Sequence, residues 1–142
     1  MVEQVSDKGI ILAIVIRNEY SESGINFFTP DNFSQQIAYM KHPKGKMIDP
    51  HLHNSVHRDV FFTNEFLFIK KGILRVDFYT DEEVYLESRL LRCGDSILLA
   101  AGGHGFEVIE EVEMIEVKQG PYAGDGDKTR FKGISVNDIR LV

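Results

Sequence analysis

Three of the five histidines of this chain fall within seven residues, as His51, His53 and His57. His51 and His53 are separated by one residue, and in an extended strand residues i and i+2 project from the same face. Two imidazoles side by side on one strand form half of a transition-metal site. Two further candidate ligands lie downstream: Glu65, which opens an apolar run, and His104, which is flanked by three glycines.

Imidazole nitrogens and a carboxylate oxygen suit Fe, Mn, Co, Ni, Cu or Zn, and ligand type alone does not choose among these metals. A mixed set of this kind with open coordination positions could polarise a carbonyl, bind dioxygen or activate a water. We therefore expect a divalent transition metal as the cofactor. The alternative is that these side chains are surface or core histidines without a metal.

Charged side chains elsewhere are weaker candidates. In the last predicted core strand, alternation places Glu116 and Lys118 on one face. If that face points into a barrel, the two residues could be catalytic or contact substrate; a solvated outer face is the alternative. Arg58, Lys128 and Arg130 lie in predicted loops and could bind an anionic substrate such as a phosphate, with a plain surface loop as the alternative.

The composition limits the possible partners. At 142 residues the chain corresponds to about one domain. A net charge of −6 argues against non-specific nucleic-acid binding and against docking on an anionic membrane. Cys93 is the only cysteine, so no intrachain disulfide can form, and we assign it no role. The longest apolar run is far shorter than the ~20 residues that span a bilayer and makes a poor signal peptide, so we expect a soluble cytoplasmic protein.

Short β-branched or alternating segments recur roughly every 8–12 residues with turn residues between them, which predicts an antiparallel all-β sandwich or barrel. The predicted strands are residues 10–17, 34–41, 47–53, 65–70, 73–79, 84–92, 96–101, 104–109 and 112–119. Hairpin turns are predicted at residues 71–72 and 110–111. Residues 18–32 are expected to form a loop with one short extended piece, and residues 134–142 a tail with modest strand character.

The spacing around the histidines resembles the first motif of the cupin superfamily. Gly45 stands five residues before His51, the pair His51 and His53 follows, and Glu65 stands six residues before Gly72. Further along the chain, Gly94, Gly102 and His104 follow in order and resemble the second cupin motif. The resemblance covers about residues 36–119.

This resemblance implies a single cupin domain over residues 1–142, with its core at about residues 34–119 and extensions at both ends. The implied fold is a jelly-roll barrel, a double-stranded β-helix of two packed sheets with a metal at its centre. His51, His53 and His104 match the histidine ligands of the family, and Glu65 matches the carboxylate. Because eleven residues separate His53 from Glu65, His57 is the alternative to Glu65.

The chain is similar to small single-domain cupins found beside enzymes that build surface polysaccharides and nucleotide sugars. We therefore expect a homodimeric, metal-dependent enzyme of unspecified reaction that acts on a small polar molecule, such as a carbohydrate derivative. One alternative is a metal-free sugar-nucleotide epimerase or isomerase with a histidine or tyrosine base. Another is a binding module that captures a small ligand without turnover.

Overall fold

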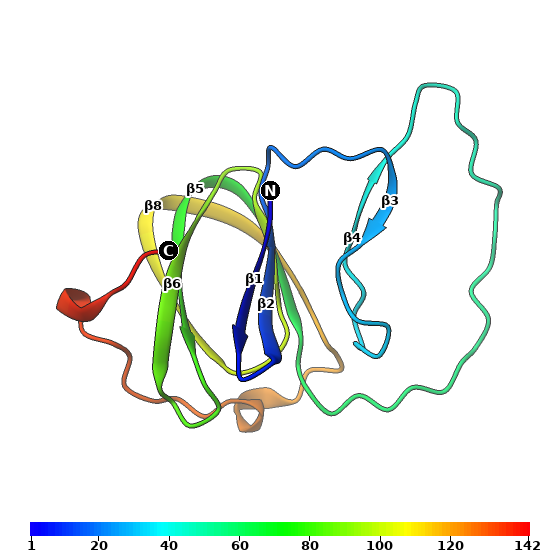
Figure 1. Cartoon of the computed structure of the whole chain (residues 1–142). Helices are drawn as coiled ribbons and strands as arrows, with labels where there is room; N and C mark the ends of the chain where they lie inside the picture. The colour runs from blue at the N-terminus through cyan, green and yellow to red at the C-terminus, as the bar shows by residue number, and fades with distance from the viewer.

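The computed structural model describes residues 1–142, and its regular secondary structure is almost entirely strand, as predicted (Figure 1). The strands are β1 (Val2–Asp7), β2 (Ile10–Ile16), β3 (Gly24–Phe27), β4 (Ala38–Lys41), β5 (Glu65–Tyr79), β6 (Tyr85–Arg92), β7 (Ser96–Leu99) and β8 (Gly103–Lys118). Two 3-10 helices follow, η1 (Gly124–Asp127) and η2 (Val136–Asp138). Neither helix has the length or apolar character needed to span a membrane.

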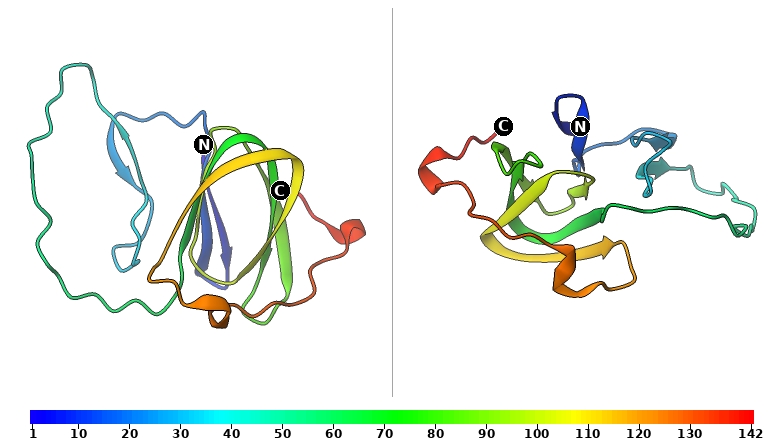
Figure 2. Two further views of the ribbon diagram at one scale, coloured as in Figure 1. Left: turned by 180° about the vertical axis from the view of Figure 1, so that it is seen from behind. Right: turned by 90° about the horizontal axis from the view of Figure 1, so that it is seen from below.

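Six strands form one antiparallel sheet in the order β1-β2-β7-β5-β6, with β8 along the other edge of β5. The first residues of β5 pair with β7 and its last residues pair with β6, whereas β8 follows β5 along its whole length. Because β5 and β8 pass from one part of the sheet to the other, the sheet curls into a half-barrel (Figures 1 and 2). Strands β3 and β4 form a separate hairpin beside it.

The two hairpin turns predicted at residues 71–72 and 110–111 are wrong, since both positions lie inside continuous strands. The two positions lie close together where β5 and β8 pair, and the register shifts there between Ile69 and Leu74. Gly72 has φ +82°, and a Cβ on it would fall 2.0 Å from the carbonyl oxygen of Glu111. The turn-forming residues therefore mark β-bulges that bend two paired strands together, rather than hairpins.

The main hydrophobic core fills the inner face of the half-barrel. Side chains of β5 reach it at Leu67 and Ile69 before the bulge and at Leu74, Val76 and Phe78 after it, so the bulge changes which alternate residues face inward. Strands β1, β2, β6 and β7 supply the remaining members, which are Val5, Leu12, Ala13, Val15, Leu91, Ile97 and Leu99. β1 pairs with β2 and β2 pairs with β7, which extends the sheet that positions the start of β5.

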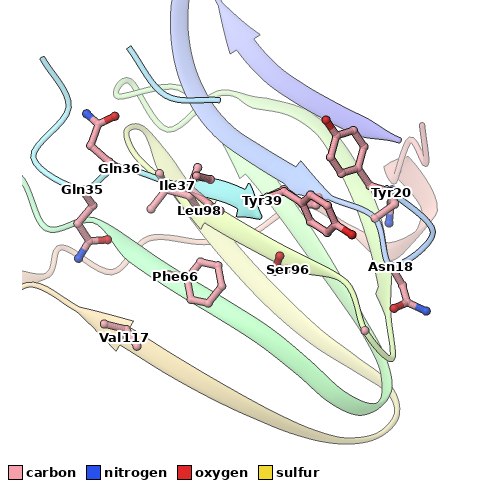
Figure 3. Close-up of a pocket in the computed structure, with 14 residues that line it drawn as sticks. Asn18, Tyr20, Gln35, Gln36, Ile37, Tyr39, Phe66, Ser96, Leu98 and Val117 are labelled. Atoms are coloured by element: carbon pink, nitrogen blue, oxygen red, sulfur yellow. The ribbon is translucent and has the colours of Figure 1, made fainter. Parts of the chain in front are cut away.

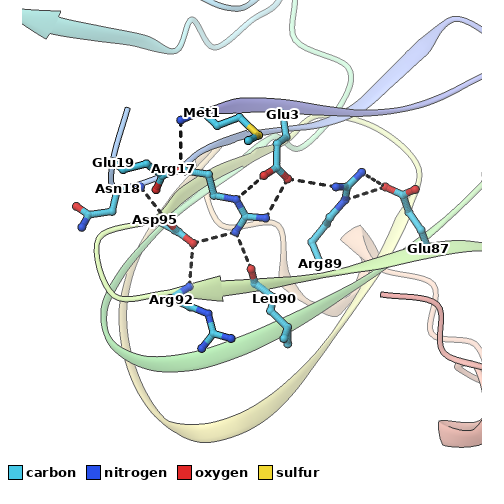
Figure 4. A network of polar contacts seen from close by, with 10 residues as sticks. All are labelled: Met1, Glu3, Arg17, Asn18, Glu19, Glu87, Arg89, Leu90, Arg92 and Asp95. Carbon is cyan, nitrogen blue, oxygen red and sulfur yellow. Dashed lines mark hydrogen bonds and ion pairs between the residues drawn. The ribbon is translucent and has the colours of Figure 1, made fainter. Parts of the chain in front are cut away.

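Ion pairs join strands that are far apart in the sequence, and β1, which was not predicted, takes part in them (Figure 4). Arg17 donates to both carboxylate oxygens of Glu3 and to Asp95, at 2.6–2.9 Å. Arg89 in turn contacts Glu3 and Glu87. These side chains are largely buried, and their ion pairs link β1, the end of β2, β6 and the turn before β7.

The predicted strand at residues 47–53 is wrong. Residues 42–64, called here the long loop, contain no strand; most of the loop extends away from the half-barrel, and its last residues return to it (Figures 1 and 2). Pro50 lacks the N–H needed for a sheet ladder, and no neighbouring strand pairs with this segment. The strand predicted at residues 34–41 is confirmed only at its end, as β4.

Candidate functional site

Glu65 is the first residue of β5, and its side chain points to the inner face of the half-barrel. It lies directly opposite Leu99 on β7 and Lys118 on β8. Leu99 belongs to the main core, and paired residues on adjacent strands share a face. Glu65 is only 5% exposed, so a carboxylate is buried at the open end of an otherwise apolar core.

His104 reaches the same place from the other end of the sequence. It is the second residue of β8 and pairs with Phe78, which lies in the main core. The glycines before it allow this approach, because a Cβ on Gly102 would fall 2.5 Å from the carbonyl oxygen of Tyr79, and one on Gly103 would fall 2.9 Å from the Phe131 ring. The Nε2 atom of His104 lies 3.1 Å from Oε2 of Glu65.

The hydrogen bond donated by His104 lowers the pKa of Glu65, and this effect outweighs burial, which acts in the opposite direction. The positive charges of Lys128 and Lys118 lower it further. Glu65 is therefore a carboxylate at neutral pH. In that state it can orient the imidazole of His104 or donate an oxygen to a cation.

The pair lines a cavity of about 700 Å³ at this end of the half-barrel, called here the mouth cavity. Three other residues singled out in the sequence also line it: Glu116, Lys128 and Arg130. Aromatic side chains form much of the remaining wall, from Phe61, Phe62, Tyr79, Phe106 and Phe131. The cavity thus combines a buried carboxylate and an imidazole with two cations and three further acidic side chains, which are Asp81, Glu116 and Asp127.

Strand pairing also places Glu116 and Lys118. Glu116 lies opposite Leu67 and Lys118 lies opposite Glu65, so both share the inner face. Their charged groups approach to 3.9 Å. By strand register this face is the inner one, and the side chains of Glu116 and Lys118 are 45% and 32% exposed there.

A second cavity of about 310 Å³, called here the side cavity, shares part of its wall with the mouth cavity. The residues common to both are Phe61, Phe62, Thr63, Asp127, Lys128 and Arg130. Lys118 and Tyr122 line only the side cavity. The glycine-rich segment around η1 lies beneath the open end of the half-barrel and forms part of this wall (Figure 1).

The structure does not bring the remaining predicted residues into this site. His51, His53, His57 and Arg58 are exposed on the long loop and line neither cavity. The rings of His51 and His53 lie 5.2 Å apart, and His57 contacts the neighbouring Asp59 at 3.0 Å. No group of three or more ligand side chains is close enough to hold a metal in this arrangement.

Sequence reasoning missed the aromatic wall of the site. Tyr79 packs edge-on against Phe131, and its hydroxyl accepts a hydrogen bond from the backbone N–H of Ile134. This contact holds the segment after η1 against the end of β5. The sequence identified Tyr79 only as one residue of an alternating strand, and no pattern around Phe131 indicated that it contacts Tyr79.

An apolar groove of about 630 Å³ lies on the opposite, outer face of the sheet (Figure 3). Tyr39 and Ile37 form one side, and Phe66, Leu98 and Val117 form the floor. The only ionisable side chains on its wall are two tyrosines and Arg17, whose guanidinium is held by Glu3 and Asp95. The groove therefore offers burial for an apolar group but no free acid or base, so the mouth cavity is the better candidate for chemistry.

In comparisons with known proteins, no family model, no curated protein and no solved structure matched this chain.

Proposed function

We propose that this chain is a metal-binding protein of the cupin type, with a jelly-roll barrel that acts on a small polar molecule such as a carbohydrate derivative. The observation that carries the proposal is the 3.1 Å contact between Glu65 and His104 at the mouth cavity. A buried carboxylate and an imidazole, 39 residues apart, meet on the inner face of the curled sheet. Nitrogen and oxygen donors at one point are the ligand types that transition metals take in proteins.

His51 and His53 would complete the ligand set if the long loop folded back over the half-barrel. Its large apolar side chains are exposed: Met47, Ile48, Leu52, Val56, Val60, Phe61 and Phe62. On β8, three residues of the inner face are also 40–55% exposed: Phe106, Val108 and Met114. Closure would bury both sets, and each buried aliphatic or aromatic side chain contributes roughly 1.5–3 kcal/mol.

The geometry of the chain permits this closure. β8 pairs with β5 alone, so its other edge is free to accept a strand. The eleven residues between His53 and Glu65 can span at most about 40 Å when extended. Folded back along this edge, the loop would bring His51 and His53 towards His104.

In this site a bound metal would act as a Lewis acid or would activate water. His51, His53, Glu65 and His104 would hold it. Glu116, on the same inner face, would accept or return a proton, and Lys128 would orient an anionic group of the substrate. The aromatic wall would exclude water and so strengthen these electrostatic contacts.

One observation favours a second candidate, a metal-free isomerase or epimerase. The pair of His104 and Glu65 is already assembled without any movement of the long loop. A carboxylate that orients an imidazole is a common arrangement for a general base. In this case His104 would remove a proton from the substrate directly.

Metal analysis of the protein purified without chelator separates the two candidates. We expect about one equivalent of a divalent transition metal in the wild type, and less than about a tenth in E65Q, in H104A and in the double variant H51A/H53A. H42A is the matched control, since His42 is also exposed on the long loop and has no assigned role. Circular dichroism verifies that each variant is folded.

Other results would redirect the proposal. A wild type with almost no metal would support the metal-free candidate. Metal retained in E65Q but lost in H57A would replace Glu65 by His57 as a ligand. Metal retained in H51A/H53A but lost in H104A would exclude closure of the long loop as described.

A further inference from the structure

Asn64 is the last residue of the long loop and directly precedes Glu65. It is only 5% exposed, although it follows a loop that is exposed over most of its length. It lines neither the mouth cavity nor the side cavity. Its contacts therefore concern the start of β5 rather than a ligand.

The backbone of Asn64 continues the pairing of β5 with β8. Glu65 pairs with Lys118, and the next residues along the two chains are Asn64 and Gln119. The N–H of Asn64 donates to the side-chain Oε1 of Gln119 at 2.7 Å, and its carbonyl oxygen accepts from the backbone N–H of Gln119 at 3.3 Å. These two bonds hold the β8 side of the chain one residue beyond Glu65.

The side chain of Asn64 secures the other side, towards β7. Glu65 pairs with Leu99, and Ala100 is the next residue of that strand's chain. Nδ2 of Asn64 donates to the carbonyl oxygen of Ala100 at 3.0 Å, and Oδ1 accepts from the hydroxyl of Ser34 at 2.9 Å. The hydrogen bonds of Asn64, called here the Asn64 clamp, therefore fix the backbone next to Glu65 on both sides of β5.

The clamp matters because the contact beside it depends on small distances. Nε2 of His104 lies 3.1 Å from Oε2 of Glu65, and a hydrogen bond weakens steeply once its atoms separate beyond about 3.2 Å. A functional pair has to be held within about 0.5 Å of its working geometry. Loops move more than the strands they connect, so without the clamp the motion of the long loop would pass directly to Glu65.

We propose that Asn64 is a positioning residue: its amide and its backbone fix the start of β5, so that Glu65 remains within hydrogen-bond distance of His104. The consequence for metal binding rests on the function proposed above, whereas the consequence for the contact between Glu65 and His104 does not. Asparagine suits the role because one side chain presents both a donor and an acceptor. An ionised aspartate has the same shape but only acceptors, so N64D would lose the bond to Ala100.

NMR of the ¹⁵N-labelled full chain tests the contact. The side-chain N–H that His104 donates to Glu65 is shielded from exchange with water by its hydrogen bond, and H104A identifies its proton resonance by the loss of that signal. We expect the resonance in the wild type and in N54D, the matched control, since Asn54 is exposed on the long loop. N64D and N64A should lose it, while circular dichroism verifies that both are folded.

Two further variants separate the parts of the clamp. S34A removes only the hydrogen bond to Oδ1 of Asn64 and leaves both strand-side anchors, so it should keep the resonance. Q119A removes the acceptor of the Asn64 N–H without altering Asn64, and it should weaken the resonance. Q119A also provides the test if neither variant of Asn64 folds.

Metal titration is the second measurement. If the metal binds as proposed, the affinity for Co²⁺ should fall about 10- to 100-fold in N64D, the range for residues that orient a ligand from outside, and should be unchanged in N54D. A wild type that shows the resonance but binds no metal would overturn the metal function and leave the role of Asn64 intact. The role of Asn64 would be overturned by a wild-type resonance in folded N64D and N64A, or in Q119A if these do not fold, and equally by a wild type that lacks the resonance.

Discussion

Asp77 is a buried carboxylate on the outer face of β5, away from the candidate site. Arg75 donates two hydrogen bonds to it, at 2.8 and 3.0 Å, and Ser88 donates a third. Burial alone would raise the pKa of Asp77, but the hydrogen bonds from Arg75 and Ser88 outweigh it and lower the pKa below its ordinary 3.8. The carboxylate is therefore more stable as an anion in the folded chain than in the unfolded chain.

We predict that D77N is less stable than the wild type by roughly 2 kcal/mol at pH 7, because it removes the buried carboxylate partner of Arg75 and leaves Glu107, which is half exposed, as the remaining one. A carboxylate whose pKa is lower in the folded chain than in the unfolded chain stabilises the fold fully at pH values above its unfolded-state pKa. This stabilisation is lost as the pH falls through its folded-state pKa. The difference between D77N and wild type should therefore shrink below about pH 4. Urea unfolding at pH 7 and pH 3.5 measures it, and D81N, at an exposed position, should show no such difference.

Asp95 holds the turn before β7. Its carboxylate accepts hydrogen bonds from the Arg17 side chain and from the backbone N–H groups of Asn18 and Arg92, at 2.9–3.0 Å (Figure 4). We predict that D95A lowers the free energy of unfolding by about 2–4 kcal/mol, because three donors lose a buried charged acceptor. E19A, which removes only an exposed pair with the N-terminus, should change it by less than about 0.5 kcal/mol. An equal loss in both variants would contradict this role for Asp95.

At the level of the elements, the bend shared by β5 and β8 decides where the site forms. Without the register shift at Gly72, Glu65 and Phe78 could not both face inward, because they are an odd number of residues apart. The bend therefore sets the positions of Glu65 and His104 relative to each other. A change at Gly72 should act on both fold and site.

We predict that G72A destabilises the fold by roughly 2–5 kcal/mol, since φ is +82° and the added Cβ would overlap the backbone of Glu111. G126A is the control, because Gly126 has open space around it and no positive φ. Thermal unfolding compares the two variants. A G72A protein as stable as G126A would show that the bend does not depend on glycine.

The long loop should be the first part of the chain that a protease cleaves. Lys44, Lys46 and Arg58 are exposed there and lie outside every strand ladder. We predict that trypsin cuts at these residues before it cuts the half-barrel, and that Mn²⁺ or Co²⁺ slows this cleavage several-fold if metal binding closes the loop. H51A/H53A should be cleaved equally fast with and without metal. Protection of that variant would contradict the closure.

For the whole molecule, the sequence predicted the fold class because strand alternation is local. The segments at residues 73–79 and 84–92 show it most clearly: the first lies within β5, and the second contains all of β6 and exceeds it by Val84 alone. The bends were misread because lysine-glycine and paired glutamates have the same local appearance in a bulge and in a hairpin. Only the long-range pairing of β5 with β8 distinguishes the two.

The candidate site, like the fold, was predicted only in part. Glu65 and His104 were identified from residue type and spacing, and the structure places them in contact. The aromatic wall of the cavity was not identified from the sequence. Phe131 contacts Tyr79 because the segment after η1 returns to the end of β5, and no local pattern indicates that path. Whether His51 and His53 join them depends on the long loop, whose sequence is apolar in parts but lacks regular alternation.

The free edge of β8 also affects how copies of the chain behave at high concentration. A 16-residue strand with an unpaired row of backbone groups is a template on which another molecule can add a strand and begin aggregation. Five glutamates lie along this strand: Glu107, Glu110, Glu111, Glu113 and Glu116. At neutral pH two such edges repel each other, whereas protonation in acid removes that repulsion and leaves the edges free to associate.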